Sequence, residues 1–388
     1  MDLRPIYLDY NATTPVAPEV LEEMLPYLRE EFGNPSSNHV YGRRAHEAIE
    51  RARARVASLI GAGADEIIFT ASGTEATNLA IRGAAHALPD RRRIVTSAFE
   101  HPATAETCAS LERNGFSVHR VPVGQDGRVR TETFEPFLGA STALVTVLHA
   151  HNEVGTIQPI AEIAEHVRRH GAAMHADAAQ TLGKIPVDVD ALGVDLLTIA
   201  GHKLYAPKGI GALYVRSGTA LAPVLTGARH ENGRRPGTEN VPGIVALGKA
   251  CEIAERRMAS ERMCVRSLRD HLLGRLRERI PGLVLHGHPT ERLPNTLFLS
   301  FPGVSGSRLL ESIPELAAST GSACHSGSEA PAASLVAMGV PENQAVGPVR
   351  LSLGRPTTVE ETERAADLLA TAWRRFVSLD RHTHLTIA

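Results

Sequence analysis

Short apolar runs alternate with amphipathic segments along the first half of the chain. Seven short runs with the pattern of strands begin at positions 67, 93, 117, 143, 172, 196 and 211. The segments between most of them place apolar residues at helical spacing, as in "IAEIAEHVRRHG" from 160 to 171. Strands that alternate with helices predict an α/β fold, in which a mostly parallel sheet carries helices on both faces.

A long helical pattern follows, from Val241 to Arg279, and a pattern of this length often links two domains. New strand signals come after it, with helical patterns around residues 309 and 361. These signals are "LVLHG", "NTLFLSF", "ELAAS" and "VRLSLG". The sequence therefore predicts a second, smaller α/β domain after the large one.

The length and composition add limits to this picture. A chain of 388 residues suits two domains, and its net charge of -2 gives no reason to expect nucleic acid or an anionic membrane as a partner. No apolar run approaches the length of a membrane span, and the start "MDLRPIYLDY" lacks the apolar core of a secretion signal. We expect a cytoplasmic protein.

The cysteines are few and scattered. They are Cys108, Cys251, Cys264 and Cys324, and none belongs to a CxxC pair. An intracellular chain without such pairs predicts neither a disulfide framework nor a structural zinc site. The first three lie on helical patterns, where we expect small residues that pack. A metal site that joins Cys324 and His325 to the "HGH" at 286–288 has no supporting ligand spacing.

Polar residues follow several predicted strands at their carboxyl ends, where α/β sheets bind ligands. Asp177 ends one strand, and His202 and Lys203 follow the next. The lysine either reaches water or is desolvated, in which case it becomes an amine nucleophile. An acid and a lysine at neighbouring strand ends fit pyridoxal phosphate, because the lysine forms a Schiff base and the acid keeps the pyridinium nitrogen protonated.

Three further strand ends supply complementary groups. "SGT" at 72–74 precedes a helix, whose first amides suit a phosphate; the alternative is simple capping of the helix by Ser72 or Thr74. His101 follows another strand and could stack on a pyridine ring, and Asn152 follows a fourth. Each would alone be interpreted as a loop residue that satisfies backbone groups. The combination points to one cofactor site.

Nine segments in order along the chain resemble the cysteine desulfurases, pyridoxal-phosphate enzymes of the class V aminotransferase group. They are "YLDYNATTP" (7–15), "FGNPSSNH" (32–39), "GTEATNLA" (73–80), "EHPA" (100–103), "HNEVG" (151–155), "HADAAQTLGK" (175–184), "GHKLYAPKGIG" (201–211), "RPGTEN" (235–240) and "STGSAC" (319–324). The resemblance spans about Tyr7 to Pro356. The short "GSAC" context is similar to the group I branch, NifS- and IscS-like, of iron–sulfur cluster assembly and nitrogenase.

The resemblance implies the architecture of fold-type I aminotransferases in a homodimer. The large domain would hold a seven-stranded, mostly parallel sheet, with the smaller α/β domain at the C-terminal side. We expect an N-terminal arm at 1–15 that joins the small domain, a large cofactor-binding domain at 16–255, and a small domain at 256–388 that carries the Cys324 loop.

For the cofactor ring, the resemblance assigns Lys203 to the Schiff base, Asp177 to the pyridinium nitrogen and Gln180 to the ring oxygen. His101 would stack on the ring and assist proton transfer.

For the cofactor phosphate, the resemblance implies binding by Thr74 and His202, and by Thr238 from the neighbouring subunit. Asn152 belongs to the cofactor site as well.

The substrate would be L-cysteine. Its carboxylate would be held by Asn152 and Arg350, with Asn38 as a further contact; a guanidinium fork matches a carboxylate, although Arg350 alone would be interpreted as a surface arginine. Cys324 would attack the substrate sulfur, leaving a persulfide on the enzyme and releasing alanine. That step needs a thiolate, for which His101 is a better base than the adjacent His325.

The chain departs from the family pattern at three places. Ala200 stands where relatives have serine or threonine, so one phosphate contact is missing. His325 follows the cysteine where many relatives have threonine or serine and some selenocysteine lyases have histidine. The chain stops soon after Asp380, so a scaffold partner that docks on a longer tail is not carried over.

Three other functions stay open at this level. One is a selenocysteine lyase, which would release selenide and alanine. Another is a fold-type I aminotransferase in which Cys324 is incidental, and a third is a binding protein that lost catalysis. The sulfur acceptor is also open among iron–sulfur cluster assembly, tRNA thiolation, cofactor synthesis and DNA sulfur modification.

Overall fold

Seven strands form one sheet in the order β2-β8-β7-β6-β5-β3-β4. The computed structural model describes the backbone of residues 4–320, 331–341, 345 and 347–385. The sheet strands are β2 (Ile67–Thr70), β3 (Arg93–Ser97), β4 (Ser117–Val121), β5 (Thr142–Leu148), β6 (Ala173–Asp177), β7 (Leu196–Ala200) and β8 (Gly211–Val215). All seven apolar runs are therefore strands, which confirms the prediction.

The direction of the strands decides where a site can form. Only β8 runs against its neighbours, since it pairs antiparallel with both β2 and β7, while the remaining pairs are parallel. The other six strands consequently point the same way. Their carboxyl ends share one edge of the sheet, and this edge collects the polar residues that follow them.

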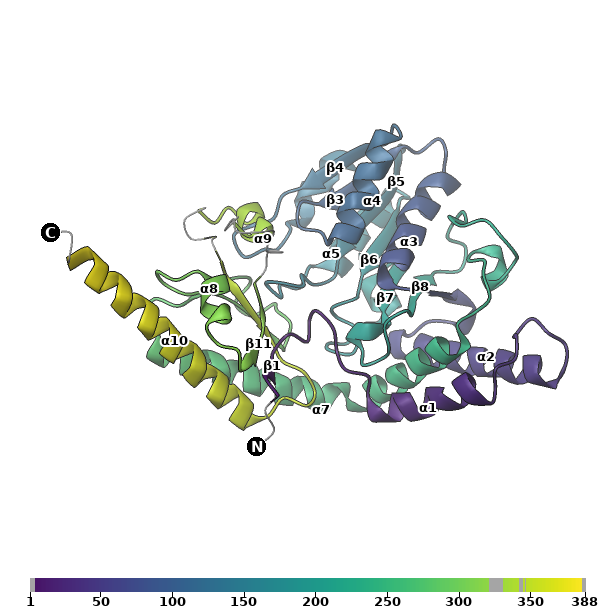
Figure 1. Ribbon diagram of the computed structural model, residues 1–388. Helices are drawn as coiled ribbons and strands as arrows, with labels where there is room; N and C mark the ends of the chain where they lie inside the picture. Colours follow the sequence, from purple (N-terminus) through teal and green to yellow (C-terminus); the bar gives the residue numbers. More distant parts are fainter. Residues whose placement is uncertain (1–3, 321–330, 342–344, 346, 386–388) are drawn as a thin grey trace.

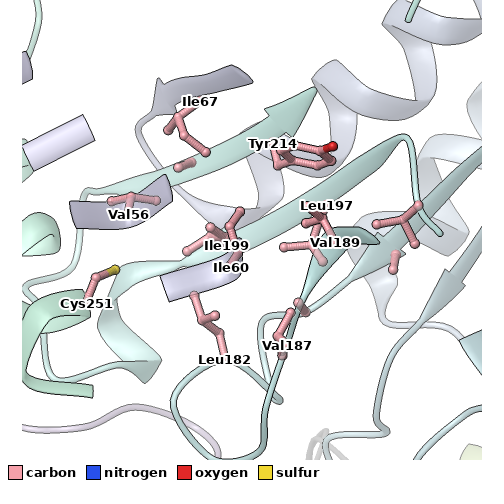
Figure 2. Packing of buried hydrophobic residues seen from close by; sticks show 14 of the residues in the cluster. Val56, Ile60, Ile67, Leu182, Val187, Val189, Leu197, Ile199, Tyr214 and Cys251 are labelled. Carbon is pink, nitrogen blue, oxygen red and sulfur yellow. The ribbon is translucent and has the colours of Figure 1, made fainter. Parts of the chain in front are cut away.

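Helices cover both faces of this sheet (Figure 1). They are α1 (Pro18–Arg29), α2 (Val40–Ile60), α3 (Gly73–Ala87), α4 (Pro102–Arg113), α5 (Ile160–Arg169), α6 (Val189–Leu192) and α7 (Val241–Arg279). One core joins α3 and α4 to the sheet, and the other joins α2, α5 and the first part of α7 to it. Figure 2 shows Val56 and Ile60 of α2 near Ile67 and Ile199 of the strands. The two-faced α/β arrangement was predicted and is confirmed.

A second lobe is built on a smaller sheet of order β12-β13-β10-β9, whose pairs are antiparallel. Its strands are β9 (Val284–Leu285), β10 (Thr296–Ser300), β12 (Ser319–Thr320) and β13 (Val349–Ser352). Its helices are α8 (Gly306–Glu311), α9 (Ala333–Ala337) and α10 (Val359–Leu385). The strand β1 (Ile6–Tyr7) pairs in parallel with β11 (Leu316–Ala317) at this lobe. The chain start thus lies against the smaller α/β unit.

The helix α7 belongs to both cores and has the bounds that the sequence predicts. Its residues up to Ala254 pack in the large lobe, and those from Val265 onward pack in the small lobe. Figure 1 shows it passing beneath both. Because α7 continues through 255 and 256, the domain boundary placed there stays a prediction.

The cysteines on helices differ from one another. Cys108 and Cys251 are fully buried, as expected, but Cys264 is exposed. The prediction that Cys264 packs is wrong. The residues of α7 in the core of the large lobe end at Ala254, and those in the core of the small lobe begin at Val265, so Cys264 belongs to neither core. Within the described ranges, no helix combines the length and the apolar character that a membrane span needs.

Candidate active site

A cavity of about 220 Å³ opens at the carboxyl edge of the large sheet. Its walls come from the ends of β2, β3, β5, β6 and β7. Seven of the predicted site residues line it: Thr74, His101, Asn152, Asp177, Gln180, His202 and Lys203. The structure therefore brings together the residues that the strand-end argument had selected one by one.

Lys203 follows β7 through one short 3-10 turn, Gly201–Lys203. The residue two positions later, Tyr205, has a φ of 63°, a strained conformation for a tyrosine. Its amide donates to Thr14 Oγ1 at 2.9 Å and its carbonyl accepts from the amide of Ala17 at 3.0 Å, so the N-terminal arm holds this turn in place.

Enclosure by protein lowers the pKa of Lys203, and Arg350 lowers it further, while Asp177 raises it. A lowered pKa increases the fraction of neutral amine at a given pH. The amine is the form that attacks a carbonyl. The cavity thus favours a nucleophilic lysine.

Asp177 ends β6 with its carboxylate at the cavity. One oxygen, Oδ1, accepts from the amide of Ala179 at 2.9 Å, which fixes the side chain. The negative charge raises the pKa of His101 and of Lys203. An oriented carboxylate of this kind suits a protonated ring nitrogen.

His101 caps the start of α4, where its Nδ1 accepts from the amide of Ala103 at 3.1 Å. A ring nitrogen that accepts from an amide carries no proton, so Nε2 carries it in the neutral ring. Burial is the main cause that lowers the pKa of His101, and Lys203 adds to it. The neutral imidazole is therefore favoured at the cavity.

The start of α3 forms the opposite wall. Ser72 is the capping residue, since its Oγ accepts from the amide of Glu75 at 3.1 Å. The capping interpretation of "SGT" is therefore confirmed for Ser72, and Ser72, Gly73 and Thr74 all line the cavity at the positive end of the helix, where a phosphate stays a prediction. His202 lies on the same cavity, and burial lowers its pKa to about 4.

These groups fit pyridoxal phosphate. A helix start with free amide groups suits the phosphate, a carboxylate suits the ring nitrogen, and an enclosed lysine suits the aldehyde carbon. The cavity is tight at the start of α3, because a Cβ added at Gly73 would lie 3.0 Å from the Cβ of Ala200. Ala200 lines the same cavity and offers no hydroxyl there.

A hydroxyl group introduced at position 200 should strengthen cofactor binding. We expect Ala200→Ser to bind pyridoxal phosphate about 10- to 100-fold more tightly, because a hydrogen bond to a charged group contributes about 1.5–3 kcal/mol. Equilibrium titration of the apoprotein, followed by quenching of its fluorescence, measures the affinity. Ala200→Gly is the control for side-chain size. Equal affinities for wild type and the serine variant would show that another group already takes this role.

The predicted carboxylate site lies beside the cavity. Arg350 is buried on β13, where its Nη2 donates to Asp9 Oδ1 at 2.8 Å and its Nη1 donates to the carbonyl of Asn152 at 3.2 Å. Its Nε has no hydrogen-bond partner within the described part of the chain. Arg350 and Asn152 therefore touch, and Asp9 is a partner of the arginine that the sequence did not reveal.

Two predicted residues of the described part of the chain, Asn38 and Thr238, do not line the cavity. Asn38 is exposed just before α2, and Thr238 is exposed at a separate cavity of about 140 Å³. Cys324 lies outside the described residues, as does His325. The roles of these residues stay predictions.

Two residues near the cavity were missed. Glu100 is enclosed by protein, which raises the pKa of its carboxyl to about 8, and it accepts from Ser97 Oγ at 2.5 Å and from the amide of Leu148 at 2.9 Å. Lys184 contacts Gln180 directly. Their signals were present, because Glu100 precedes His101 in "EHPA" and Lys184 ends "QTLGK".

The histidines of "HGH" have other partners. His286 Nε2 lies 2.7 Å from Ser300 Oγ, and His288 Nδ1 accepts from the amide of Glu291 at 2.9 Å. Among the residues that the structure describes, no group of three His, Cys, Asp or Glu side chains could hold a metal ion.

Comparisons with known proteins show the family to which the chain belongs. Residues 6–365 match the family model described as aminotransferase class-V. A curated protein named cysteine desulfurase IscS, from Dictyoglomus turgidum, is 46% identical over 369 residues, which cover 94% of each chain. A solved structure described as a NifS-like protein superposes with a TM-score of 0.89 at 37% identity and covers 95% of this chain and 98% of its own. Another, described as SspA in complex with cysteine, gives a TM-score of 0.76 at 34% identity and covers 89% and 98%.

Proposed function

Since this chain belongs to the class-V aminotransferases and, within them, to the cysteine desulfurases, we propose that it removes sulfur from L-cysteine and releases L-alanine. One observation carries the proposal. An enclosed lysine with a lowered pKa, Lys203, shares a cavity with the carboxylate of Asp177 and the start of α3. This is the donor set for pyridoxal phosphate, and a solved relative of this fold is described as a complex with cysteine.

Pyridoxal phosphate would be held by the residues of the cavity. Thr74 and His202 would bind its phosphate, and Asp177, Gln180 and His101 would surround its ring, beside Asn152. When bound, the cofactor acts as an electron sink for the α-carbon of an amino acid, which makes the sulfur of cysteine open to attack.

The protein's own groups would move the protons. The Lys203 amine, favoured by enclosure, would hold the aldehyde group of the cofactor and, once released from it, would take the α-proton of the substrate. The Nε2 of His101 carries a proton in the neutral ring, because Nδ1 is engaged by Ala103. In this tautomer the ring can donate the Nε2 proton, and a base role toward a thiol would require Nδ1 to release the amide of Ala103 and carry the proton instead.

Sulfur transfer would need Cys324 as a thiolate. Its Sγ forms a bond to the substrate sulfur, the bond between that sulfur and Cβ breaks, and the electron pair stays on carbon. Protonation of that carbon gives the methyl group of alanine, and a persulfide is left on Cys324 for an acceptor protein. Atoms and charge balance without an external oxidant.

The substrate carboxylate would meet Arg350, with Asn152 beside it and Asn38 as a further contact. Arg350 is already paired with Asp9, which orients the guanidinium on a buried strand. A carboxylate arriving from the cavity therefore shares this arginine with Asp9 rather than meeting a mobile side chain.

A homodimer would complete the site. Thr238 is exposed and away from the cavity of its own chain, which suits a contact with the cofactor phosphate of a second subunit. Large apolar side chains are also exposed along residues 16–41; they are Val16, Leu21, Leu28, Phe32, Val40 and Tyr41. The free, buried Cys108 and Cys251 are compatible with a reducing compartment such as the cytoplasm.

The test is alanine release from L-cysteine by the purified protein, with pyridoxal phosphate and a reductant present. We expect wild type to release alanine and sulfide, and Cys324→Ala to release neither. Cys264→Ala is the matched control, because that cysteine is exposed on α7 and takes no part in the proposed reaction.

Other outcomes point to other functions. Alanine from L-selenocysteine alone would identify a selenocysteine lyase. Turnover that survives Cys324→Ala would identify an aminotransferase-like reaction in which the cysteine is incidental. A protein without cofactor absorbance in the visible range would contradict the proposal.

A further inference from the structure

A lysine that the proposed reaction does not use lies directly behind the cavity. Lys184 Nζ donates to Gln180 Oε1 at 2.8 Å and to Asn11 Oδ1 at 2.9 Å. Protein encloses this amine, and the loss of water, helped by Lys203 and Arg350, lowers its pKa well below the usual value. Burying a lysine amine costs free energy unless it is hydrogen-bonded, and here two side-chain amide oxygens accept from it.

The chemistry of lysine fixes the direction of these hydrogen bonds. Lys184 Nζ donates along this contact, so the atom of Gln180 that faces it is the carbonyl oxygen. The opposite end of the amide is then the NH₂ group. One of its N–H bonds donates to the backbone carbonyl of Asn11 at 2.9 Å. The second N–H remains for the cavity that Gln180 lines.

Asn11 is the second hydrogen-bond acceptor of Lys184. It is 1% exposed, and its Oδ1 accepts from Lys184 and from Asn295 Nδ2, the latter at 3.0 Å. Its Nδ2 donates to the carbonyl of Asn152 at 3.1 Å. Asn11 therefore cannot rotate its amide without losing several contacts, and Lys184 has a fixed partner on each side.

We propose that Lys184 is a positioning residue, which orients the amide of Gln180 so that an N–H, and not the carbonyl, faces the cofactor ring oxygen. The proposal rests on the function proposed above, because that function supplies the ring oxygen. Without Lys184 only the carbonyl of Asn11 still favours this orientation, so the flipped amide, which presents an oxygen to the ring oxygen, becomes more populated. The lysine thus acts through Gln180 and does not touch the reacting atoms.

The test follows the visible absorbance of the cofactor-loaded protein as the pH is raised. A hydrogen bond to the negative ring oxygen makes the neighbouring proton easier to lose, so it lowers the midpoint of the absorbance change. We expect Lys184→Met to raise this midpoint by about half to one pH unit. Gln180→Leu should raise it similarly, and the double variant no further, because both remove the same hydrogen bond.

Two further variants separate orientation from folding. Lys184→Gln keeps a hydrogen-bonding side chain but can accept as well as donate, so it no longer dictates the direction of the amide and should also raise the midpoint. Lys249→Met removes a lysine that pairs with Glu252 on α7 and should leave it unchanged. The thermal midpoint of each apoprotein is measured in parallel. A merely structural role would lower the thermal midpoint of both Lys184 variants while the spectroscopic midpoint stays at the wild-type value.

Several results would overturn the proposal. One is an unchanged spectroscopic midpoint in both Lys184 variants while Gln180→Leu shifts it. Another is a double variant whose shift is the sum of the two single shifts. A protein that lacks cofactor absorbance would overturn both this proposal and the proposed function. Failure of alanine release with the midpoint shift intact would contradict the proposed function alone.

Discussion

Replacement of Lys203 by alanine should abolish turnover, lowering it by about 10³-fold or more. The side chain would supply both the amine for the cofactor and a base for the α-proton, and among the described residues no second lysine lines the cavity. Lys184 lies behind Gln180 with both acceptors engaged, so it does not replace the missing amine. The visible absorbance of bound cofactor should change to that of the free aldehyde.

Alanine release and the absorbance spectrum measure this result. Lys249→Ala serves as the control, because it removes a partly exposed ion pair on α7 and should leave both readings as in wild type. Substantial turnover by the Lys203 variant would show that the reaction does not pass through this lysine. The cofactor proposal would then fail.

The second large effect is expected for Asp177→Asn. The carboxylate is held by the amide of Ala179 at the end of β6, and an asparagine keeps its shape while losing the charge. Without that charge the ring nitrogen is not kept protonated, so turnover should fall by about 10²- to 10³-fold. The variant should retain bound cofactor, because Lys203 is intact, and this separates it from the Lys203 variant.

The loss of the charge also changes the neighbouring groups. Asp177 raises the pKa of His101 and of Lys203, so both pKa values should fall in the variant. The basic limb of the pH–activity profile should therefore move to lower pH. Asp195→Asn is the matched control: it lies at the other end of the neighbouring strand, where its Oδ2 accepts from the amide of Met174 at 2.8 Å. Equal loss of activity in both variants would indicate a general effect on the sheet.

The strand-end residues could be predicted because their signals are local. Each apolar run marks a strand, and strands of one direction share an edge, so Asp177 and Lys203 had to meet at the same place. The long helix was predicted to its ends for the same reason. These features depend on periodicity and on the residues next to it, which the sequence displays directly.

Contacts across long separations could not be predicted. Lys184 donates to Asn11, which is 173 positions away in the sequence, and Arg350 donates to Asp9, which is 341 positions away. No local pattern encodes such pairs, because either residue could equally face water. The exposure of Cys264 has a related cause, since helical spacing indicates a face but not which core that face has reached.

The pairing of β1 with β11 has a consequence for the order in which the protein is built during synthesis. The large sheet is complete once residue 215 has left the ribosome, but Ile6 must wait for Leu316 before its strand has a partner. Asn11, a few residues along, likewise needs Asn295 and Ser352. The segment around β1 is thus made well before its partners and is placed only after them. A nascent chain can form its large sheet early, yet the contacts of Asn11 are complete only after β13 has emerged.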